Sequence, residues 1–280
     1  MLRLITLMIL AGVATTQPRP FTPFELPRGS TIMDVAFTGD NRTMYATLVS
    51  ATQRYTIVEA HYHGERWSAP KPVSFSGTWR DLEEVLAPDA SYMIFASNRP
   101  IVPGGKPLDA FYAGRYSPKR GGNLWIVRRT PDGWGTPQRL PDAINANTST
   151  FSPAVAADGT LYFMRATGPG GHFHLFVSHP EGGTYADAQP ATFADSRYGE
   201  FDPTVAADDS VVIFSSTRAP VPHGTDHLFI AVRRNGEWST PRDLGLPINA
   251  GGHDVEARLS PNAKQLYYST SGTVLFVDLR

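Results

Sequence analysis

A nine-residue pattern recurs five times along the chain, and it carries acidic side chains at two related positions. The acids are Asp34, Glu83, Asp202 and Glu256 at its second position, and Asp81, Glu200 and Asp254 two residues before that position. Residues two apart point to the same side of a β-strand, so both sets face one way if the pattern is a strand. Carboxylates gathered in this way bind a hard cation such as calcium, pair with arginines, or take up protons at a raised pKa.

The acids also allow a hydrolytic alternative. A glycoside hydrolase needs a carboxylic acid and a carboxylate base beside the bond that breaks, and Glu256, Asp34 and Asp202 offer an acid, a base and an orienting group. Against this, the three occupy equivalent positions, whereas acid–base catalysis needs unlike environments that separate the pKa values. In a third interpretation, each acid caps a turn or pairs with an arginine of its own repeat, Arg99 or Arg218.

Other catalytic chemistry has little support in the sequence. The absence of cysteine excludes disulfides, thiolate nucleophiles and cysteine-bound metals. No nucleophile elbow, phosphate loop or dinucleotide fingerprint occurs. The pairs His61/His63 and His172/His174 are predicted at opposite ends of different repeats, so they do not share one metal ion. We therefore expect no cofactor except, at most, a divalent cation such as calcium.

Short strands must position the acids. Each copy of the pattern ends in a polar turn that leads to further β-rich runs, and several copies close on a tryptophan and a proline. The copies span residues 33–41, 82–90, 151–159, 201–209 and 255–263. Four short strands per unit at this period are typical of propeller blades. We predict an all-β, five-bladed β-propeller whose four-stranded blades start near residues 31, 80, 149, 199 and 253.

The last copy ends after three strands. The segment Phe21–Pro27 resembles residues 135–141, which form the predicted outer strand of an earlier unit. We therefore predict that Phe21–Pro27 supplies the missing strand and closes the ring, because closure removes an exposed sheet edge. The predicted propeller is a single domain over residues 21–280.

The N-terminus has the pattern of an export signal. Arg3 precedes an apolar run from Leu4 to Ala14 that ends in small residues. The run is too short to span a bilayer, and we predict a signal peptide at residues 1–14, a short extension at 15–20 and no transmembrane segment in the mature chain. The expected location is periplasmic or secreted. A net charge of −1 gives no overall field that would gather nucleic acid.

The loops on one face are the expected binding surface. Tight turns are predicted on the lower face, and longer loops on the upper face. The longest loop, Pro100 to Gly122, contains Lys106, Tyr112, Arg115 and Tyr116. Aromatic side chains mixed with cations suit a protein or carbohydrate surface. The alternative is a solvated loop that packs over its own blade.

The Ser/Ala-Pro-Asp turns, the Phe-x-Ser-x-Arg segments at 95–99 and 214–218, and the Trp-x-x-Pro strands resemble TolB-type, WD-like propeller repeats. The resemblance covers residues 21–280, and it implies an exported propeller that binds other molecules, in a family of mixed function. We predict a non-catalytic protein that binds an envelope or extracellular protein, or a glycan, through its upper face and channel mouth. The residues expected to bind are Asp81, Glu83, Arg99, Glu200, Asp202, Arg218, Asp254, Glu256, Lys106, Tyr112, Arg115 and Tyr116.

Overall fold

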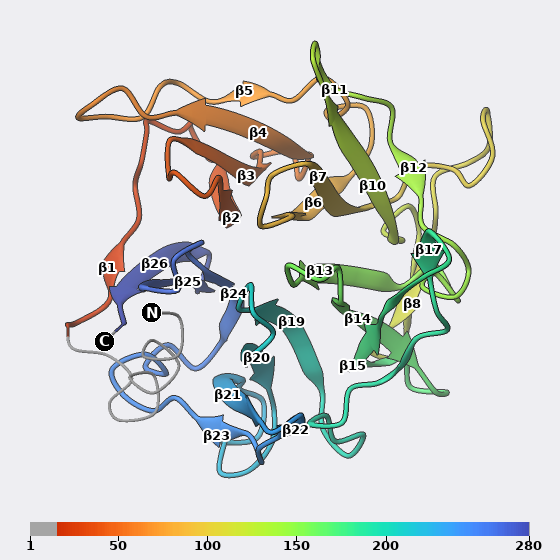
Figure 1. Cartoon of the computed structure of the whole chain (residues 1–280), viewed down its shortest axis with the longest axis vertical. Coiled ribbons are helices and arrows are strands. Elements are labelled where there is room, and N and C mark those ends of the chain that lie inside the picture. The colour runs from red at the N-terminus through yellow and green to blue at the C-terminus, as the bar shows by residue number, and fades with distance from the viewer. Residues whose placement is uncertain (1–15, 280) are drawn as a thin grey trace.

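Five small antiparallel sheets stand around a common axis (Figure 1). The computed structural model describes residues 16–279, so the predicted signal peptide at 1–14 lies outside the described residues. The sheets confirm the predicted five-bladed β-propeller. The innermost strands start at residues 31, 81, 150, 200 and 254, each within one residue of its predicted position. Within residues 16–279, no helix is long and apolar enough to cross a membrane.

The first two blades follow the chain from the inside of the ring outward. Blade one contains β2 (Thr31–Phe37), β3 (Thr43–Val49), β4 (Tyr55–His61) and β5 (Lys71–Pro72). Blade two contains β6 (Asp81–Leu86), β7 (Tyr92–Ser97) and β10 (Asn123–Thr130), with β11 (Gly133–Trp134) and β12 (Gln138–Arg139) both paired to β10. The insertion between β7 and β10 forms a separate hairpin of β8 (Ala110–Tyr112) and β9 (Arg115–Ser117).

The remaining blades repeat this order. Blade three contains β13 (Thr150–Val155), β14 (Leu161–Thr167), β15 (His172–Ser178) and β18 (Gln189–Pro190), with a small hairpin of β16 (Pro180–Glu181) and β17 (Thr184–Tyr185). Blade four contains β19 (Glu200–Val205), β20 (Val211–Ser216) and β21 (His227–Arg234), with β22 (Glu237–Trp238) and β23 (Arg242–Asp243) both paired to β21. Blade five contains β24 (Asp254–Leu259), β25 (Gln265–Thr270), β26 (Thr273–Asp278) and β1 (Arg19–Pro20).

The N-terminal segment closes the ring, but two residues earlier than predicted. The strand that pairs with β26 is Arg19–Pro20, and the Phe21 amide adds one more hydrogen bond to the carbonyl of Val274. The prediction of a strand over Phe21–Pro27 is therefore wrong in its limits. Phe21 instead anchors the junction, because its ring lies 5.0 Å from Tyr267 and 6.0 Å from Phe276.

The inner strands are largely buried because neighbouring blades cover them on both faces. Every residue of β13 and β20 is buried, and β20 reads as the continuous run Val-Val-Ile-Phe before two serines. Aromatic side chains fill the spaces between blades. Trp134 of blade two packs against Tyr45 of blade one with ring centroids 5.8 Å apart.

Aspartates hold the turns between the first and second strands of the blades. Asp89 Oδ1, for example, accepts a hydrogen bond from the Ser91 amide at 3.0 Å, and Asp158 Oδ1 accepts one from the Thr160 amide at 2.8 Å. Such side chain to backbone bonds stabilise tight turns. We call the face of the ring that carries these turns the lower face, and the opposite face the upper face.

Candidate functional site

Each innermost strand contains a β-bulge, where two residues oppose one residue of the second strand. In four blades the first bulge residue has a positive φ, which is 57° at Glu83, 46° at Ser152, 51° at Asp202 and 56° at Glu256. Residues other than glycine adopt this conformation infrequently, and a bulge re-aims the side chain that it contains. The bulges therefore direct one side chain from each of four blades toward the axis.

Blade one departs from this arrangement and corrects one prediction. Asp34 occupies the second position of its bulge, as Glu84 does in blade two, and Met33 occupies the first. In the sequence, Asp34 and Glu83 lie equally far from the turn that follows their strands, so the prediction placed them at equivalent positions. In the structure, β2 forms one more residue pair with its neighbour after the bulge than β6 does, and this difference shifts Asp34 to the second bulge position. Asp34 therefore reaches the axis from a different backbone position than the other three acids.

A chain of hydrogen bonds runs around the axis and connects the blades. In blade one, Thr47 Oγ1 donates to Glu84 Oε2 at 2.7 Å and accepts from the Glu83 amide at 3.0 Å. Glu83 Oε2 accepts from the Ser152 amide of blade three at 2.7 Å. Ser152 Oγ donates to Asp202 Oδ1 of blade four at 2.7 Å. Blades one to four are thus linked through polar side chains.

Blade five completes this circuit. The Glu256 amide donates to Asp202 Oδ2 at 3.3 Å, and Arg258 Nη2 donates to Asp34 Oδ2 of blade one at 3.0 Å. Arg258 Nη2 also lies 3.5 Å from Glu256 Oε2. We call this set the axial cluster, and it consists of Asp34, Thr47, Glu83, Glu84, Ser152, Asp202, Glu256 and Arg258. Its hydrogen bonds join all five blades in a closed ring.

The charged groups of the axial cluster are all buried, and none is more than 6% exposed. Burial, together with the charge of Asp202, raises the pKa of Glu83 to about 7. Burial also raises the pKa of Glu84 and Glu256 well above the ordinary range of a glutamate. Burial therefore favours the neutral form of Glu84 and Glu256, while Arg258 supplies a positive charge beside them.

Three members of the axial cluster meet part of the requirement for a hard cation. One oxygen each from Glu83, Asp202 and Glu256 lies within 4.8 Å of the others. Both oxygens of Asp202 and one of Glu83 already accept hydrogen bonds, and calcium takes about six to eight oxygen ligands. The three carboxyls would therefore satisfy only part of a calcium ion's coordination.

The other three predicted acids do not join the axial cluster. Arg99 Nη2 donates to Asp81 Oδ1 at 2.7 Å, and Arg218 forms the equivalent ion pair with Glu200. Among the described residues no arginine forms an ion pair with Asp254, and its Oδ2 accepts from the Gly251 amide at 3.3 Å. The seven acids that strand alternation predicted to face one way thus form two sets, one in the axial cluster and one held inside individual blades. Asp81 and Glu200 follow the third interpretation, in which the arginine of each blade neutralises its acid.

Sequence reasoning missed Glu84 and Arg258. Regular alternation along a strand predicts that adjacent residues such as Glu83 and Glu84 face opposite sides. The bulge interrupts this alternation, so both glutamates join the axial cluster. The sequence did contain an indication of Arg258. The equivalent position, directly after the bulge, is Val85, Ala154 or Thr204 in other blades, and it is charged only in blade five.

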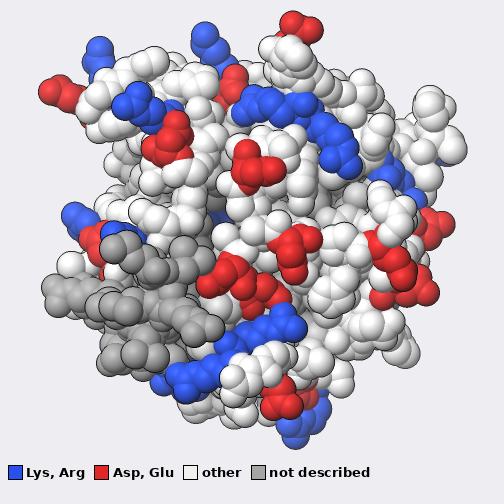
Figure 2. Space-filling view, viewed as in Figure 1, with Lys and Arg blue, Asp and Glu red and all other residues white. Residues whose placement is uncertain are grey.

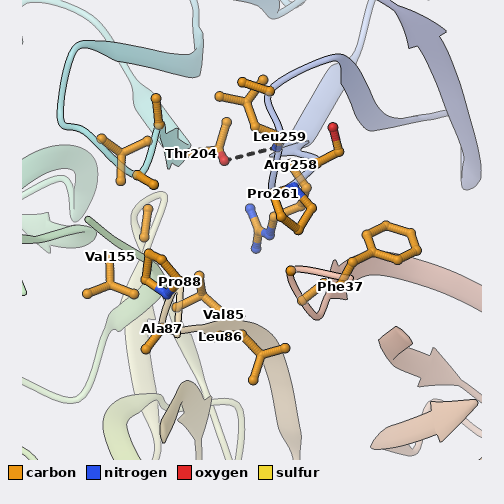
Figure 3. A pocket seen from close by; sticks show the side chains of 18 of the residues that line it. Phe37, Val85, Leu86, Ala87, Pro88, Val155, Thr204, Arg258, Leu259 and Pro261 are labelled. Carbon is orange, nitrogen blue, oxygen red and sulfur yellow. Dashed lines mark hydrogen bonds between the residues drawn. The ribbon is translucent and has the colours of Figure 1, made fainter. Parts of the chain in front are cut away.

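A funnel opens at the lower mouth of the ring, below the axial cluster (Figure 3). Its volume is about 330 Å³, and the ends of the innermost strands and the turns that follow them form its wall. Valine, leucine, alanine and proline side chains predominate in the wall, and Arg258 points into the space between them. The sequence-based expectation placed the binding surface on the upper face and did not include this cavity.

The hairpin of the blade-two insertion lies against blade three, while Leu108 and Lys119 on either side of it are hydrogen-bonded to Asn98 of blade two. The amides of Ala113 and Gly114 donate to the carbonyls of Gly171 and Gly170 at 2.9 and 2.7 Å. Tyr112 packs against Phe173 with ring centroids 5.4 Å apart, so it serves to attach the hairpin. Lys106, Arg115 and Tyr116, the other predicted binding residues of the loop, are exposed.

The histidine pairs lie on different blades, as predicted. His61 ends β4 of blade one, whereas His172 and His174 lie on β15 and line a cavity of about 360 Å³ beside blade four. Burial, with some effect of His172, lowers the pKa of His174. His174 is therefore neutral at physiological pH.

Comparison with known proteins shows the class of fold. No protein family model and no curated protein matches the sequence. The structure is similar to TolB from Acinetobacter baumannii, with a TM-score of 0.51 and 16% identity over 90% of this chain and 50% of that protein, so the chain spans about half the length of that TolB. It is also similar to the gluconolactonase XC5397 from Xanthomonas campestris, with a TM-score of 0.51 and 12% identity over 96% and 97% of the two chains.

A glycoside hydrolase gives a TM-score of 0.61 with 9% identity over 95% of this chain and 92% of that one. At such low identity these similarities establish a β-propeller, and the fold alone does not carry an activity. The chain is thus a β-propeller that shares its architecture with TolB, a lactonase and a glycoside hydrolase.

Proposed function

We propose that the protein is an exported, non-catalytic propeller of the TolB-like type that binds an acidic envelope or extracellular protein through its blade-two insertion. The observation that carries this proposal is a concentration of exposed apolar side chains. Among the described residues, seven large hydrophobic side chains are exposed, and four of them lie on the insertion. These four are Ile101, Val102, Phe111 and Tyr116, with exposures of 50%, 63%, 44% and 65%. Exposed apolar patches of this kind support partner binding.

The charge of the insertion favours an acidic partner. Lys106, Arg115, Lys119 and Arg120 are exposed, and none of them forms an ion pair with another described residue. The one acid among them, Asp109, accepts hydrogen bonds from the Tyr116 hydroxyl and from the Lys119 amide. Aromatic side chains between cations are the combination that protein interfaces favour, and complementary charge accelerates association.

The attachment of the insertion to blade three supports the same role. Two backbone hydrogen bonds and the Tyr112–Phe173 contact hold the hairpin in place before any partner arrives. A surface that is already ordered loses little conformational entropy on binding. The hairpin is therefore suited to present Phe111 and Tyr116 as rigid contacts.

The axial acids give less support to the glycan-hydrolase alternative. A substrate would have to contact Asp34, Asp202 and Glu256, which are 2%, 5% and 6% exposed. Burial raises the pKa of all three, so it does not shift an acid and a base in opposite directions. Their hydrogen bonds between blades account for them as structural residues.

Capture experiments with paired variants test the binding proposal. We expect Tyr116→Ala with Arg115→Glu to weaken binding of an envelope or extracellular partner about tenfold or more, since both changes remove central contacts. The control is Tyr62→Ala with Arg66→Glu, which makes the same changes at an exposed site on blade one. Binding is measured by titrating the purified partner at low and high salt. Equal affinity for the two double variants, or preferential binding of a polysaccharide, would overturn the proposal.

Export is tested separately. We expect the full-length chain, produced with its own N-terminus in a bacterium, to appear outside the cytoplasm with residues 1–14 removed. Fractionation followed by N-terminal sequencing measures this. A cytoplasmic protein that retains residue 1 would contradict the prediction.

A further inference from the structure

The funnel at the lower mouth combines three features that the binding role of the upper face does not use. The first is its wall, in which small apolar side chains predominate. Val35, Ala87, Pro88, Val155, Ala206 and Pro261 come from all five blades and surround the cavity of about 330 Å³. Cavities of this size accommodate a small molecule or a few side chains of a partner.

The second feature is an incompletely paired cation at the closed end of the funnel. Arg258 is the one charged side chain in the wall, and it is only 6% exposed. Its Nη1 donates to the Ala257 carbonyl, and its Nη2 donates to Asp34 and lies 3.5 Å from Glu256 Oε2, but its Nε has no acceptor among the described residues. A buried N–H without an acceptor is costly, and a carbonyl that enters the funnel gives the guanidinium a further acceptor. Figure 3 shows the guanidinium within the funnel.

The third feature is a negatively charged rim. Four of the five turns that follow the innermost strands carry an aspartate, namely Asp40, Asp89, Asp158 and Asp208, and the fifth carries Asn262. Wall residues such as Gly39, Pro88 and Ala207 immediately precede three of these aspartates. Figure 2 shows acidic side chains gathered around the central hollow of the ring.

Within the described chain, the rim aspartates have no basic partner of their own, and two of them have a lowered pKa. The Thr38 hydroxyl lowers the pKa of Asp40, and the Ser91 hydroxyl lowers the pKa of Asp89. None of the four rim aspartates forms an ion pair with a basic residue of the described chain. Negative charges around a concave mouth attract a cationic ligand.

We propose that the funnel binds an extended peptide segment of a partner protein, in which a short run of small apolar residues is flanked by lysine or arginine. The apolar residues pack against the wall, a backbone carbonyl accepts from Arg258, and the basic residues lie beside the rim aspartates. A neutral amide suits the closed end better than a carboxylate does, because Asp34 already balances the charge of Arg258. This site is separate from the insertion and does not depend on its function.

The turns themselves supply a conservative variant for the test. Asn262 Oδ1 accepts from the Lys264 amide at 3.0 Å, just as Asp40 Oδ1 accepts from the Arg42 amide at 3.0 Å. Asparagine at Asp40, Asp89, Asp158 and Asp208 therefore keeps the turn and removes the charge. The control neutralises the same number of exposed acids away from the funnel, with Glu65→Gln, Asp132→Asn, Asp187→Asn and Glu237→Gln.

A second variant blocks the funnel itself. Gly39 has an ordinary negative φ, and a Cβ added there meets only the Pro88 carbonyl, at 3.9 Å. Gly39→Trp thus places a large side chain across the mouth between blades one and two without backbone strain. It fills the space that a bound peptide requires.

The probe is the strongest binder selected from a random-peptide phage library on the wild-type protein, synthesised with a fluorescent label. We expect basic residues beside small apolar ones in the selected sequences. We expect the four-asparagine variant to bind this peptide about tenfold more weakly at low salt, Gly39→Trp to lose binding, and the control to match the wild type. Selection of no peptide, selection of peptides without basic residues, or equal binding by the wild type and either funnel variant would overturn the proposal.

Discussion

The substitution Glu83→Gln provides a sharp test of the axial cluster. Glutamine has nearly the shape of glutamate and still offers an oxygen to the Ser152 amide, so the link between blades two and three remains. The substitution removes an ionisable group. Burial, together with the charge of Asp202, raises the pKa of this group from 4.5 to about 7. This difference corresponds to about 3 kcal/mol of folding free energy.

The sign follows from where the proton is held. Between pH 4.5 and about 7, the folded protein keeps a proton on Glu83 that the unfolded chain releases. Stability from this group is complete below pH 4.5, declines as the pH rises, and is lost above about 7. We therefore compare the free energy of unfolding of Glu83→Gln with that of the wild type at each pH. Between low pH and a pH above about 7, this difference should shift in favour of Glu83→Gln by about 3 kcal/mol.

Urea unfolding over a series of pH values, followed by tryptophan fluorescence, measures the effect. The control is Glu237→Gln, which removes an exposed carboxyl on β22 and should leave the pH dependence unchanged. If the wild type and Glu83→Gln lose stability in parallel as the pH rises, then Glu83 is not held in a buried, protonated state, and the account of the axial cluster fails.

Three further predictions concern the ion pairs, the closure and a bound metal. Arg99→Met leaves Asp81 buried without its partner and should lower the free energy of unfolding by about 3–5 kcal/mol, whereas Arg19→Met breaks an exposed pair and should cost less than about 1 kcal/mol in the same urea titration. Phe21→Ala removes the aromatic anchor of the closing strand and should cost about 3 kcal/mol, with faster amide exchange in β26 than in β20; uniform exchange in both strands would contradict it. Because both oxygens of Asp202 and one of Glu83 already accept hydrogen bonds, calcium or EDTA should not change the Tm in calorimetry, and a rise of several degrees with calcium would refute this.

The fold could be predicted from the sequence because each blade is specified locally. The apolar inner strands, the aspartate turns and the recurring tryptophans reappear in each unit, so the number of units follows from counting them. The closing strand was placed only approximately, because Arg19–Pro20 carries no apolar alternation and Phe21, which looked like its start, is an anchor beside it. Short edge strands leave little pattern in a sequence.

The site was predicted less completely, because its geometry depends on bulges. The pattern identified Glu83, Asp202 and Glu256 as neighbours, and the shared contacts in the axial cluster agree with that. It misplaced Asp34 by one bulge position and left out Glu84 and Arg258. A bulge changes which of two adjacent residues faces the axis, and its position is set by pairing with the second strand.

The amino-acid sequence by itself determined the repeat and the number of blades, and it offered the pairing of Asp81 and Glu200 with the arginines of their own blades as one interpretation. These depend on residues close together in one hairpin, where strand alternation fixes the neighbours. Only the tertiary structure decided that acids from separate blades share hydrogen bonds in one ring and that Arg258 lies at the closed end of an apolar funnel. Those distances exist only once the first and last blades meet, because closure brings Asp34 and Arg258 from nearly opposite ends of the chain to within 3.0 Å.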